Sequence, residues 1–255
     1  MGSPFDKIAF IVLAAGLGKR MKSEKAKVLH ELDGKPMILY LLDTLNNIAQ
    51  NNIIVVIGHQ AEEVKKVISE KHKVSYAKQE KQLGTGHAVL VATPYVNPYT
   101  ENIVILCGDV PLVSCDTIQN LIRHHINTDG DMTILATNIS DPKGYGRIVF
   151  KDENIVEKIV EEADADENEK KITTINTGIY CVRKEFLLDS IKKIKPVNAQ
   201  GEFYFTDVIH IGFRENMKIQ AISIGKDPME YIGINSCEEL VKAEKIVRNR
   251  MHKRP

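Results

Sequence analysis

The chain has 255 residues, and its 34 Lys and Arg residues balance 34 Asp and Glu residues, so the formal net charge is zero. Apolar residues make up 43% and charged residues 27%, which is typical of a globular protein and excludes a disordered or collagen-like chain. A neutral balance argues against a nucleic-acid partner or a membrane partner, because both are recognised through an excess of positive charge.

The apolar runs are far shorter than the roughly 20 residues that span a bilayer, and the N-terminus has no secretory signal pattern. We therefore expect a cytoplasmic protein. The cysteines show no C-x-x-C pair and no metal-binding spacing, so we expect free thiols. They are Cys107, Cys115, Cys181 and Cys237.

Short β-rich segments alternate along the chain with segments of helical period. Buried strands are predicted at 8–14, 53–57, 103–107, 132–137, 175–182 and 219–224, with a further candidate at 155–160. Helices are predicted at 37–47, 62–70, 117–125, 205–213 and 238–250. This alternation predicts an α/β fold, with a mixed, mainly parallel sheet flanked by helices in a Rossmann-like arrangement.

A turn with two glycines, LAAGLGKRM at 13–21, follows the first predicted strand. Glycines let the backbone approach a ligand, and successive amides can hold phosphate. The turn matches neither a dinucleotide-binding fingerprint nor a P-loop. A basic cluster follows, which consists of Lys19, Arg20, Lys22, Lys25 and Lys27. In it, Arg20 offers a planar fork of hydrogen-bond donors, and Lys27 offers a compact positive charge. The pattern predicts a phosphate-rich ligand, with a solvated charge run as the alternative.

Two later segments combine glycine with a polar side chain. In QEKQLGTGHA at 79–88, the Gln79 amide can both donate to and accept from the edge of a pyrimidine base, although a plain loop and helix start would read the same. In GDVPL at 108–112, Asp109 follows a buried strand. Ligands of open parallel sheets bind beyond the strand C-termini, so Asp109 is a candidate magnesium ligand, with an ordinary helix cap as the alternative.

In this order, the segments resemble the sugar-1-phosphate nucleotidyltransferases, and in particular the pyrophosphorylase domain of bacterial N-acetylglucosamine-1-phosphate uridyltransferases. The matching stretches are LAAGLGKRM with AKVLH, QLGTGHA, GDVPL, GYGRI, INTGI, NAQGEFYFTD and GIN, between Leu13 and Asn235. The resemblance implies the nucleotide-diphospho-sugar transferase fold, which is GT-A-like. It also implies two substrates, UTP and N-acetylglucosamine 1-phosphate, and no obligate protein partner.

The resemblance assigns roles position by position. The nucleotide would be lined by Ala14, Gly16 and Gly18, and uracil would be read by Gln79, Gly84 and Thr85. The sugar would be bound by Gly146, Glu161, Asn176, Tyr204 and Thr206. The magnesium ion (Mg2+) would be held by Asp109 and Asn235, and the phosphates would be gripped by Arg20 and Lys27.

Four positions depart from the family pattern. Lys19 replaces a threonine of the glycine turn, and Lys27 follows Ala26 where the family has proline. Cys107 replaces a common tyrosine and Ala163 a common lysine, both on the sugar side. Transfer to another sugar phosphate or from another nucleotide is therefore one alternative. A catalytically silent protein that binds nucleotide sugars is another.

The resemblance also suggests a domain organisation. We expect a nucleotidyltransferase domain at 1–235, followed by a C-terminal helix and basic tail at 236–255. The sequence ends before any hexapeptide repeat, so a β-helix acetyltransferase domain is not expected within it.

Overall fold

The computed structural model describes residues 5–49, 52–224, 228–231 and 233–252. Within these ranges a nine-stranded mixed sheet has the order β5-β4-β1-β6-β10-β7-β11-β9-β8. Its strands are β1 Ile8–Ala14, β4 Ile53–Ile57, β5 Ser75–Lys78, β6 Asn102–Cys107, β7 Met132–Asn138, β8 Arg147–Asp152, β9 Ile155–Val160, β10 Thr174–Arg183 and β11 Ile219–Ile222. A separate hairpin joins β2 Glu31–Leu32 to β3 Lys35–Pro36.

The two halves of the sheet differ in strand direction. Strands β5, β4, β1 and β6 are parallel neighbours. Strand β10 runs antiparallel to both β6 and β7, while β7 and β11 are parallel and β9 pairs antiparallel with β11 and β8. The predicted mixed sheet is confirmed, and its longest parallel run is the half that contains β1.

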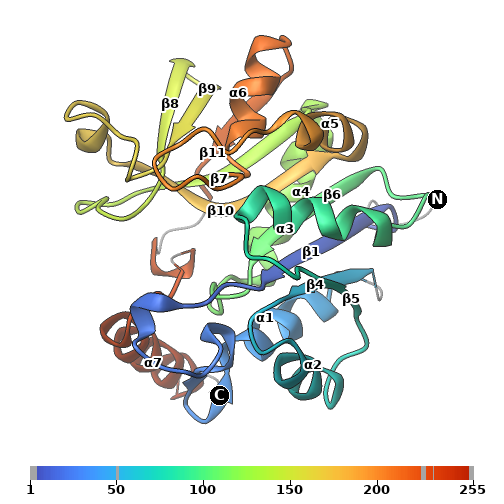
Figure 1. Cartoon of the computed structure of the whole chain (residues 1–255), viewed down its shortest axis with the longest axis vertical. Helices are drawn as coiled ribbons and strands as arrows, with labels where there is room; N and C mark the ends of the chain where they lie inside the picture. The colour runs from blue at the N-terminus through green and yellow to red at the C-terminus, as the bar shows by residue number, and fades with distance from the viewer. Residues whose placement is uncertain (1–4, 50–51, 225–227, 232, 253–255) are drawn as a thin grey trace.

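Helices cover both faces of this sheet (Figure 1). They are α1 Met37–Asn46, α2 Ala61–Ser69, α3 Thr85–Ala92, α4 Cys115–Thr128, α5 Lys184–Ser190, α6 Asp207–Arg214 and α7 Cys237–His252. None of the described helices is long and apolar enough to cross a membrane. The last three residues of the predicted basic tail, 253–255, lie outside the described residues.

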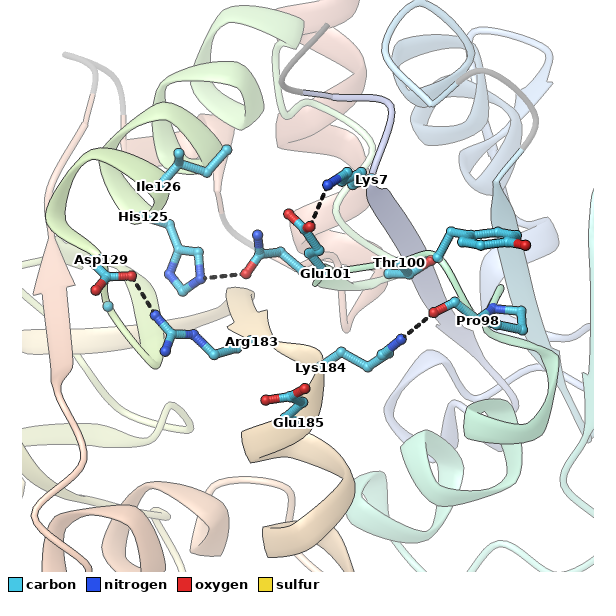
Figure 2. Close-up of a pocket in the computed structure, with 13 residues that line it drawn as sticks. Lys7, Pro98, Thr100, Glu101, His125, Ile126, Asp129, Arg183, Lys184 and Glu185 are labelled. Atoms are coloured by element: carbon cyan, nitrogen blue, oxygen red, sulfur yellow. Dashed lines mark hydrogen bonds and ion pairs between the residues drawn. The ribbon is translucent and has the colours of Figure 1, made fainter. Parts of the chain in front are cut away.

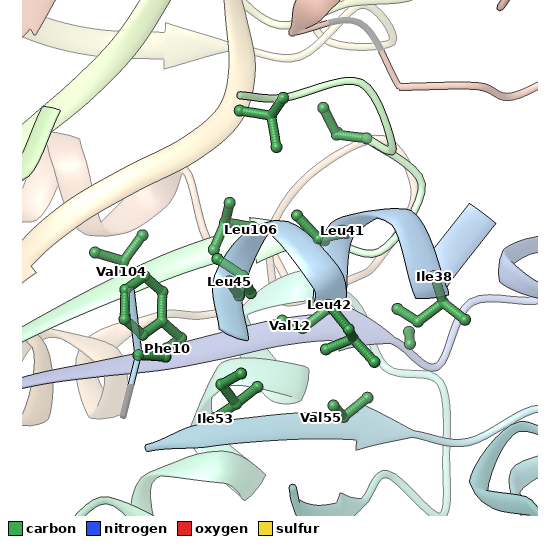
Figure 3. Close-up of a cluster of buried hydrophobic side chains, with 14 of the residues drawn as sticks. Phe10, Val12, Ile38, Leu41, Leu42, Leu45, Ile53, Val55, Val104 and Leu106 are labelled. Carbon is green, nitrogen blue, oxygen red and sulfur yellow. The ribbon is translucent and has the colours of Figure 1, made fainter. Parts of the chain in front are cut away.

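The side chains of β1 alternate between the two faces of the sheet, which explains why apolar cores lie on both faces. Phe10 and Val12 point into a cluster shared with α1, α2 and α4, while Ala9 and Ile11 point into a cluster shared with α3, α5 and α6. Figure 3 shows the first cluster, in which leucines of α1 lie over the side chains of β1, β4 and β6. Burial on both faces is why these strands are continuous apolar runs.

A smaller apolar cluster attaches α7 to the rest of the molecule. Ala243 and Val247 of this helix pack with Leu32 of β2, Met37 of α1 and Leu112. In Figure 1, α7 lies beside the blue segment that follows β1. This attachment places the start of α7 close to the glycine-containing turn.

Candidate active site

The candidate site lies beyond the carboxyl ends of two adjacent parallel strands, β1 and β6. The chain leaves β1 to form β4 and β5 on one side of it, and later adds β6 on the other side. Such a point, where the strand order reverses, is where ligands bind in open α/β sheets. Ala14 ends β1, and Asp109 follows β6 by two residues.

Four polar side chains meet at this position. The Lys27 ammonium contacts Asp109 Oδ2, and it donates to Asn235 Oδ1 at 2.6 Å. Arg20 Nη2 donates to the same Asn235 oxygen at 2.8 Å. The side chains of Lys27 and Asp109 are each 15% exposed, so their charges are only partly screened by water. The structure therefore brings together both predicted phosphate-binding cations and both predicted magnesium ligands.

The two oxygen atoms from Asp109 and Asn235 suit a small divalent cation. Both oxygen atoms contact Lys27 Nζ, so they lie close together around one positively charged group. Magnesium is commonly held by one or two protein oxygens together with substrate phosphates. Among the described residues, no group of three or more His, Cys, Asp or Glu side chains is arranged to hold a metal. A site completed by substrate fits that observation.

The glycine-containing turn lies directly beside this cluster. Gly16 is exposed, whereas Gly18 packs against the Lys27 side chain. Arg20 and Lys27 each belong to a short 3-10 turn, Lys19–Met21 and Lys27–Leu29. Gly18 therefore lies against Lys27 and two residues before Arg20, and nucleotide binding by Ala14, Gly16 and Gly18 stays a prediction.

The predicted base-reading segment is held by internal hydrogen bonds. Gln79 is 3% exposed, and its Nε2 donates to Gly84 O at 3.0 Å and contacts His87 Nδ1 at 3.0 Å. Gly84 has φ +110°, and a Cβ atom there would lie 2.6 Å from Phe203 O, so no other residue fits. Thr85 Oγ1 accepts from Phe205 N at 2.9 Å. That bond ties the segment to residues 203–206, and base recognition by Gln79, Gly84 and Thr85 stays a prediction.

Three of the predicted sugar-binding residues touch one another. Thr206 Oγ1 donates to Glu161 Oε1 at 3.0 Å, and a Cβ atom on Gly146 would lie 3.3 Å from Glu161 Oε2. Burial raises the pKa of Glu161, and the Thr206 hydrogen bond opposes that rise. The group is therefore a shielded carboxyl between two buried residues, Gly146 and Thr206, and its role in sugar binding stays a prediction.

Asn176 and Tyr204 complete the predicted sugar side. Asn176 donates from its backbone N to Gly146 O at 2.9 Å, and its Nδ2 donates to Tyr180 OH at 2.7 Å. The Tyr204 hydroxyl is buried, has no hydrogen-bond partner among the described residues, and has a raised pKa because of burial and nearby carboxylates. A buried hydroxyl without a partner is costly, and a hydrogen bond to a ligand would remove that cost. Sugar binding by Asn176 and Tyr204 stays a prediction.

Comparison with known proteins places the chain in a family. A family model described as "Nucleotidyl transferase" matches residues 9–226. The chain belongs to the nucleotidyl transferase family. The family resemblance drawn from the sequence motifs is thereby confirmed.

Several proteins of known name are similar in sequence to this nucleotidyl transferase chain. "Bifunctional protein GlmU" of Thermoanaerobacter pseudethanolicus is 45% identical over 249 residues, which cover 98% of this chain and 53% of the relative. "Bifunctional protein GlmU" of Geotalea uraniireducens is 41% identical, with 97% and 54% covered. That of Desulfotalea psychrophila is 39% identical, with 97% and 73% covered. The chain spans about half the length of most of the relatives it matches.

A solved structure shares the nucleotidyl transferase fold. The crystal structure of HddC from Yersinia pseudotuberculosis superposes with a TM-score of 0.70 at 22% identity, covering 94% of this chain and 99% of that one. The predicted fold is therefore confirmed.

An ion pair beside the nucleotidyl transferase site was missed from the sequence. Arg147, 2% exposed, pairs through Nη1 with Glu162 Oε2 at 2.7 Å, and the same oxygen accepts from Gly144 N at 3.0 Å. A Cβ atom on Gly144 would lie 3.7 Å from Arg20 Nη1, so the pair holds this loop beside Arg20. Burial raises the pKa of Tyr145, in the same loop, to about 12. The available signal was an arginine directly before the apolar pair Ile148 and Val149, since a buried charge needs a partner.

A cavity lies at the other end of the sheet, away from the candidate site. It has a volume of about 590 Å³ and is lined by residues that precede β1 and β6, by the end of α4, and by residues at the junction of β10 and α5 (Figure 2). Two of its cations form ion pairs, Lys7 with Glu101 and Arg183 with Asp129 at 2.6 Å, and Lys184 Nζ donates to Pro98 O at 2.6 Å. Because the carboxyl ends of β1 and β6 face the opposite way, this cavity is separate from the candidate site.

Proposed function

We propose that the chain is a magnesium-dependent uridylyltransferase that forms UDP-N-acetylglucosamine and pyrophosphate from UTP and N-acetylglucosamine 1-phosphate. The observation that carries the proposal is the meeting of Arg20, Lys27, Asp109 and Asn235 at the strand-order reversal. The relatives named "Bifunctional protein GlmU" support it.

The proposed reaction joins two anions and needs no covalent enzyme intermediate. A phosphate oxygen of the sugar phosphate attacks the α-phosphorus of UTP in line, and a new phosphorus–oxygen bond forms. The bond from the α-phosphorus to the bridging oxygen breaks, and pyrophosphate leaves with that electron pair. Because the nucleophile is already an anion, the protein's task is to orient the substrates and neutralise charge.

Each residue of the candidate site would contribute to this task according to its chemistry. Arg20 can bind two phosphate oxygens at once, and the Lys27 ammonium can follow the charge that moves to the leaving group. Asp109 and Asn235 would hold magnesium, which supplies a further positive charge to the phosphates. Ala14, Gly16 and Gly18 would present backbone N–H groups to the nucleotide.

The other site residues would select the substrates. Gln79, Gly84 and Thr85 would contact the uracil ring, with the Gln79 amide oriented by its bond to Gly84. The sugar would lie against Gly146, Glu161, Asn176, Tyr204 and Thr206. The Tyr204 hydroxyl and the Glu161 carboxyl are the groups best suited to hydrogen-bond its hydroxyl and acetamido groups.

Pyrophosphate release across a panel of nucleoside triphosphates and sugar 1-phosphates tests the proposal. We expect release with UTP and N-acetylglucosamine 1-phosphate in the presence of magnesium, and none after chelation. Preference for glucose 1-phosphate or for a purine nucleotide would overturn the substrate assignment. No release with any pair, together with measurable binding of UDP-N-acetylglucosamine, would favour the silent binding protein.

A further inference from the structure

The segment that carries Asn235 lies directly on Asp109. A Cβ atom on Gly233 would lie 3.3 Å from both Asp109 carboxylate oxygens, and Ile234 N donates to Asp109 O at 2.9 Å. The backbone therefore approaches Asp109 as closely as a side-chain-free residue allows. Any shift of this segment changes the distance between Asp109 and Asn235.

The Asn235 amide is held in one orientation. Its Nδ2 donates to Gly233 O at 2.9 Å, so the opposite atom, Oδ1, faces Lys27 and Arg20. A flipped amide would place its oxygen against the Gly233 carbonyl and its nitrogen against two cations. The local backbone therefore determines which atom of Asn235 is offered to a cation.

One carboxylate holds that backbone. Glu239 Oε2 accepts from Asn235 N at 2.6 Å and from Ser236 N at 3.1 Å, while Ser236 Oγ accepts from Glu239 N at 3.2 Å. The exchange between Ser236 and Glu239 is a capping box, which satisfies free N–H groups at the start of α7. The bond to Asn235 N lies outside the box, one residue before the cap.

The helix α7 that carries Glu239 is anchored in the apolar core. Ala243 and Val247 anchor the helix in the same apolar cluster as Ile234, the residue before Asn235. The carboxylate of Glu239 also lies at the helix end that favours negative charge. Helix, cap and site segment are thus joined within a few residues.

We propose that Glu239 is a positioning residue for Asn235. Through its carboxylate it sets the backbone of Asn235 so that Oδ1 converges with Asp109 on a bound divalent cation. This inference rests on the proposed function, because it assumes that Asp109 and Asn235 hold that cation.

Mn2+ binding to the full chain in the presence of UDP-N-acetylglucosamine, whose phosphates would complete the site, tests the role without requiring turnover; it is measured from the electron paramagnetic resonance signal of the free ion. Asp109→Ala removes the proposed carboxylate ligand, so its Mn2+ affinity is the reference for a lost site. We expect Glu239→Ala to weaken Mn2+ binding at least about tenfold, as loss of groups that orient metal ligands does. Glu239→Gln keeps an acceptor oxygen and is expected to stay within about threefold of wild type, as a capping box accepts either residue.

Two controls separate positioning from helix stability and from charge. Ser236→Ala removes the hydroxyl of the cap but keeps the Glu239–Asn235 bond, so it should lower the melting temperature and leave Mn2+ binding unchanged. Glu238→Ala removes the same charge from the exposed neighbouring position and should leave Mn2+ binding within about twofold. In assays, Glu239→Ala should raise the Mg2+ concentration for half-maximal rate while kcat at saturating Mg2+ changes little.

The outcomes separate this inference from the proposed function. A folded Glu239→Ala protein that binds Mn2+ as tightly as wild type overturns the positioning role. Equal losses of Mn2+ binding in Ser236→Ala and Glu239→Ala would show a helix-stability effect and also overturn it. If Asp109→Ala binds Mn2+ like wild type, both proposals fail. Normal Mn2+ results without pyrophosphate release overturn only the proposed function.

Discussion

Gly18 lies directly against Lys27, because a Cβ atom on Gly18 would stand 2.7 Å from the Cβ atom of Lys27. The φ angle of Gly18 is +62°, a conformation that costs other residues about 1–2 kcal/mol. Gly18→Ala should therefore lower the free energy of unfolding by at least about 1 kcal/mol and displace Lys27, with turnover reduced roughly tenfold. Urea unfolding and steady-state kinetics would measure both effects.

Gly16→Ala is the matched control for that substitution. Nothing lies within 4 Å of a Cβ atom built at Gly16, so its free energy of unfolding should change by less than about 0.5 kcal/mol. Equal destabilisation of the two variants would show that the contact with Lys27 is unimportant.

Lys27→Ala and Asp109→Ala should each lower turnover at least about a hundredfold, since loss of one charge-stabilising group costs on the order of 3 kcal/mol in the transition state. Lys25→Ala is the control, because Lys25 belongs to the same basic cluster but forms an exposed pair with Glu31 at 3.0 Å. It should stay within about threefold of wild type. Turnover of the Lys27 or Asp109 variant within threefold of wild type would remove these residues from the mechanism.

Gln60 fastens the segment that precedes Lys27. Its Oε1 accepts from Ala26 N at 2.7 Å, and its Nε2 donates to Glu24 O at 2.8 Å. Gln60→Ala should lower kcat/KM roughly tenfold, because small displacements of a charged group in a phosphoryl-transfer site are costly. Gln60→Glu keeps the acceptor and loses the donor, so an intermediate value is expected. A wild-type kcat/KM for Gln60→Ala would show that the segment holds Lys27 without this side chain.

The stability of the protein should depend on pH through Asp207. Burial, with a smaller contribution from Asp164, raises the pKa of Asp207 from 3.8 to about 6 in the folded chain. Between these values the folded state holds a proton that the unfolded state has lost, so stability falls as pH rises. Asp207→Asn should flatten the dependence of the unfolding free energy between pH 4 and about 6, in chemical denaturation at several pH values. An unchanged slope would assign it to other groups.

The strands were largely predictable, and the reason is visible in particular residues. Strands β1 and β4 are apolar at consecutive positions because both faces are covered, and their predicted and observed limits agree. Strand β5 was missed because it is short and has two exposed residues at the sheet edge. Strand β8 was missed because it begins with a buried arginine and ends exposed.

The prediction of the helices was less complete than that of the strands. Only the start of α3 was indicated, because its apolar residues show no clear helical face, and α5 was missed because it is a single short segment. The prediction at 205–213 began two residues before α6, since Phe205 is buried but precedes the helix. The prediction at 219–224 extended two residues beyond β11, because the apolar pattern outlasts the strand pairing.

The candidate site residues could be predicted from motifs in the sequence, whereas the residues that hold them in place could be identified only in the structure. Arg20, Lys27, Asp109 and Asn235 each occur in a recognisable motif, and the structure brings them together. Gln60 lies in an unremarkable segment, and its function appears only once β4 places it beside residues 24–26. The Ser236–Glu239 capping box was readable from spacing, but its bond to Asn235 was not.

The order of synthesis follows from where the site residues lie in the chain. Asn235 joins Lys27 across 208 positions and Arg20 across 215. The last strand of the described sheet, β11, ends at Ile222, so the ribosome has added every one of these strands before it adds the amide that bonds to Lys27. A nascent chain can therefore pair much of its sheet before the amide that links Lys27 to Arg20 has been made.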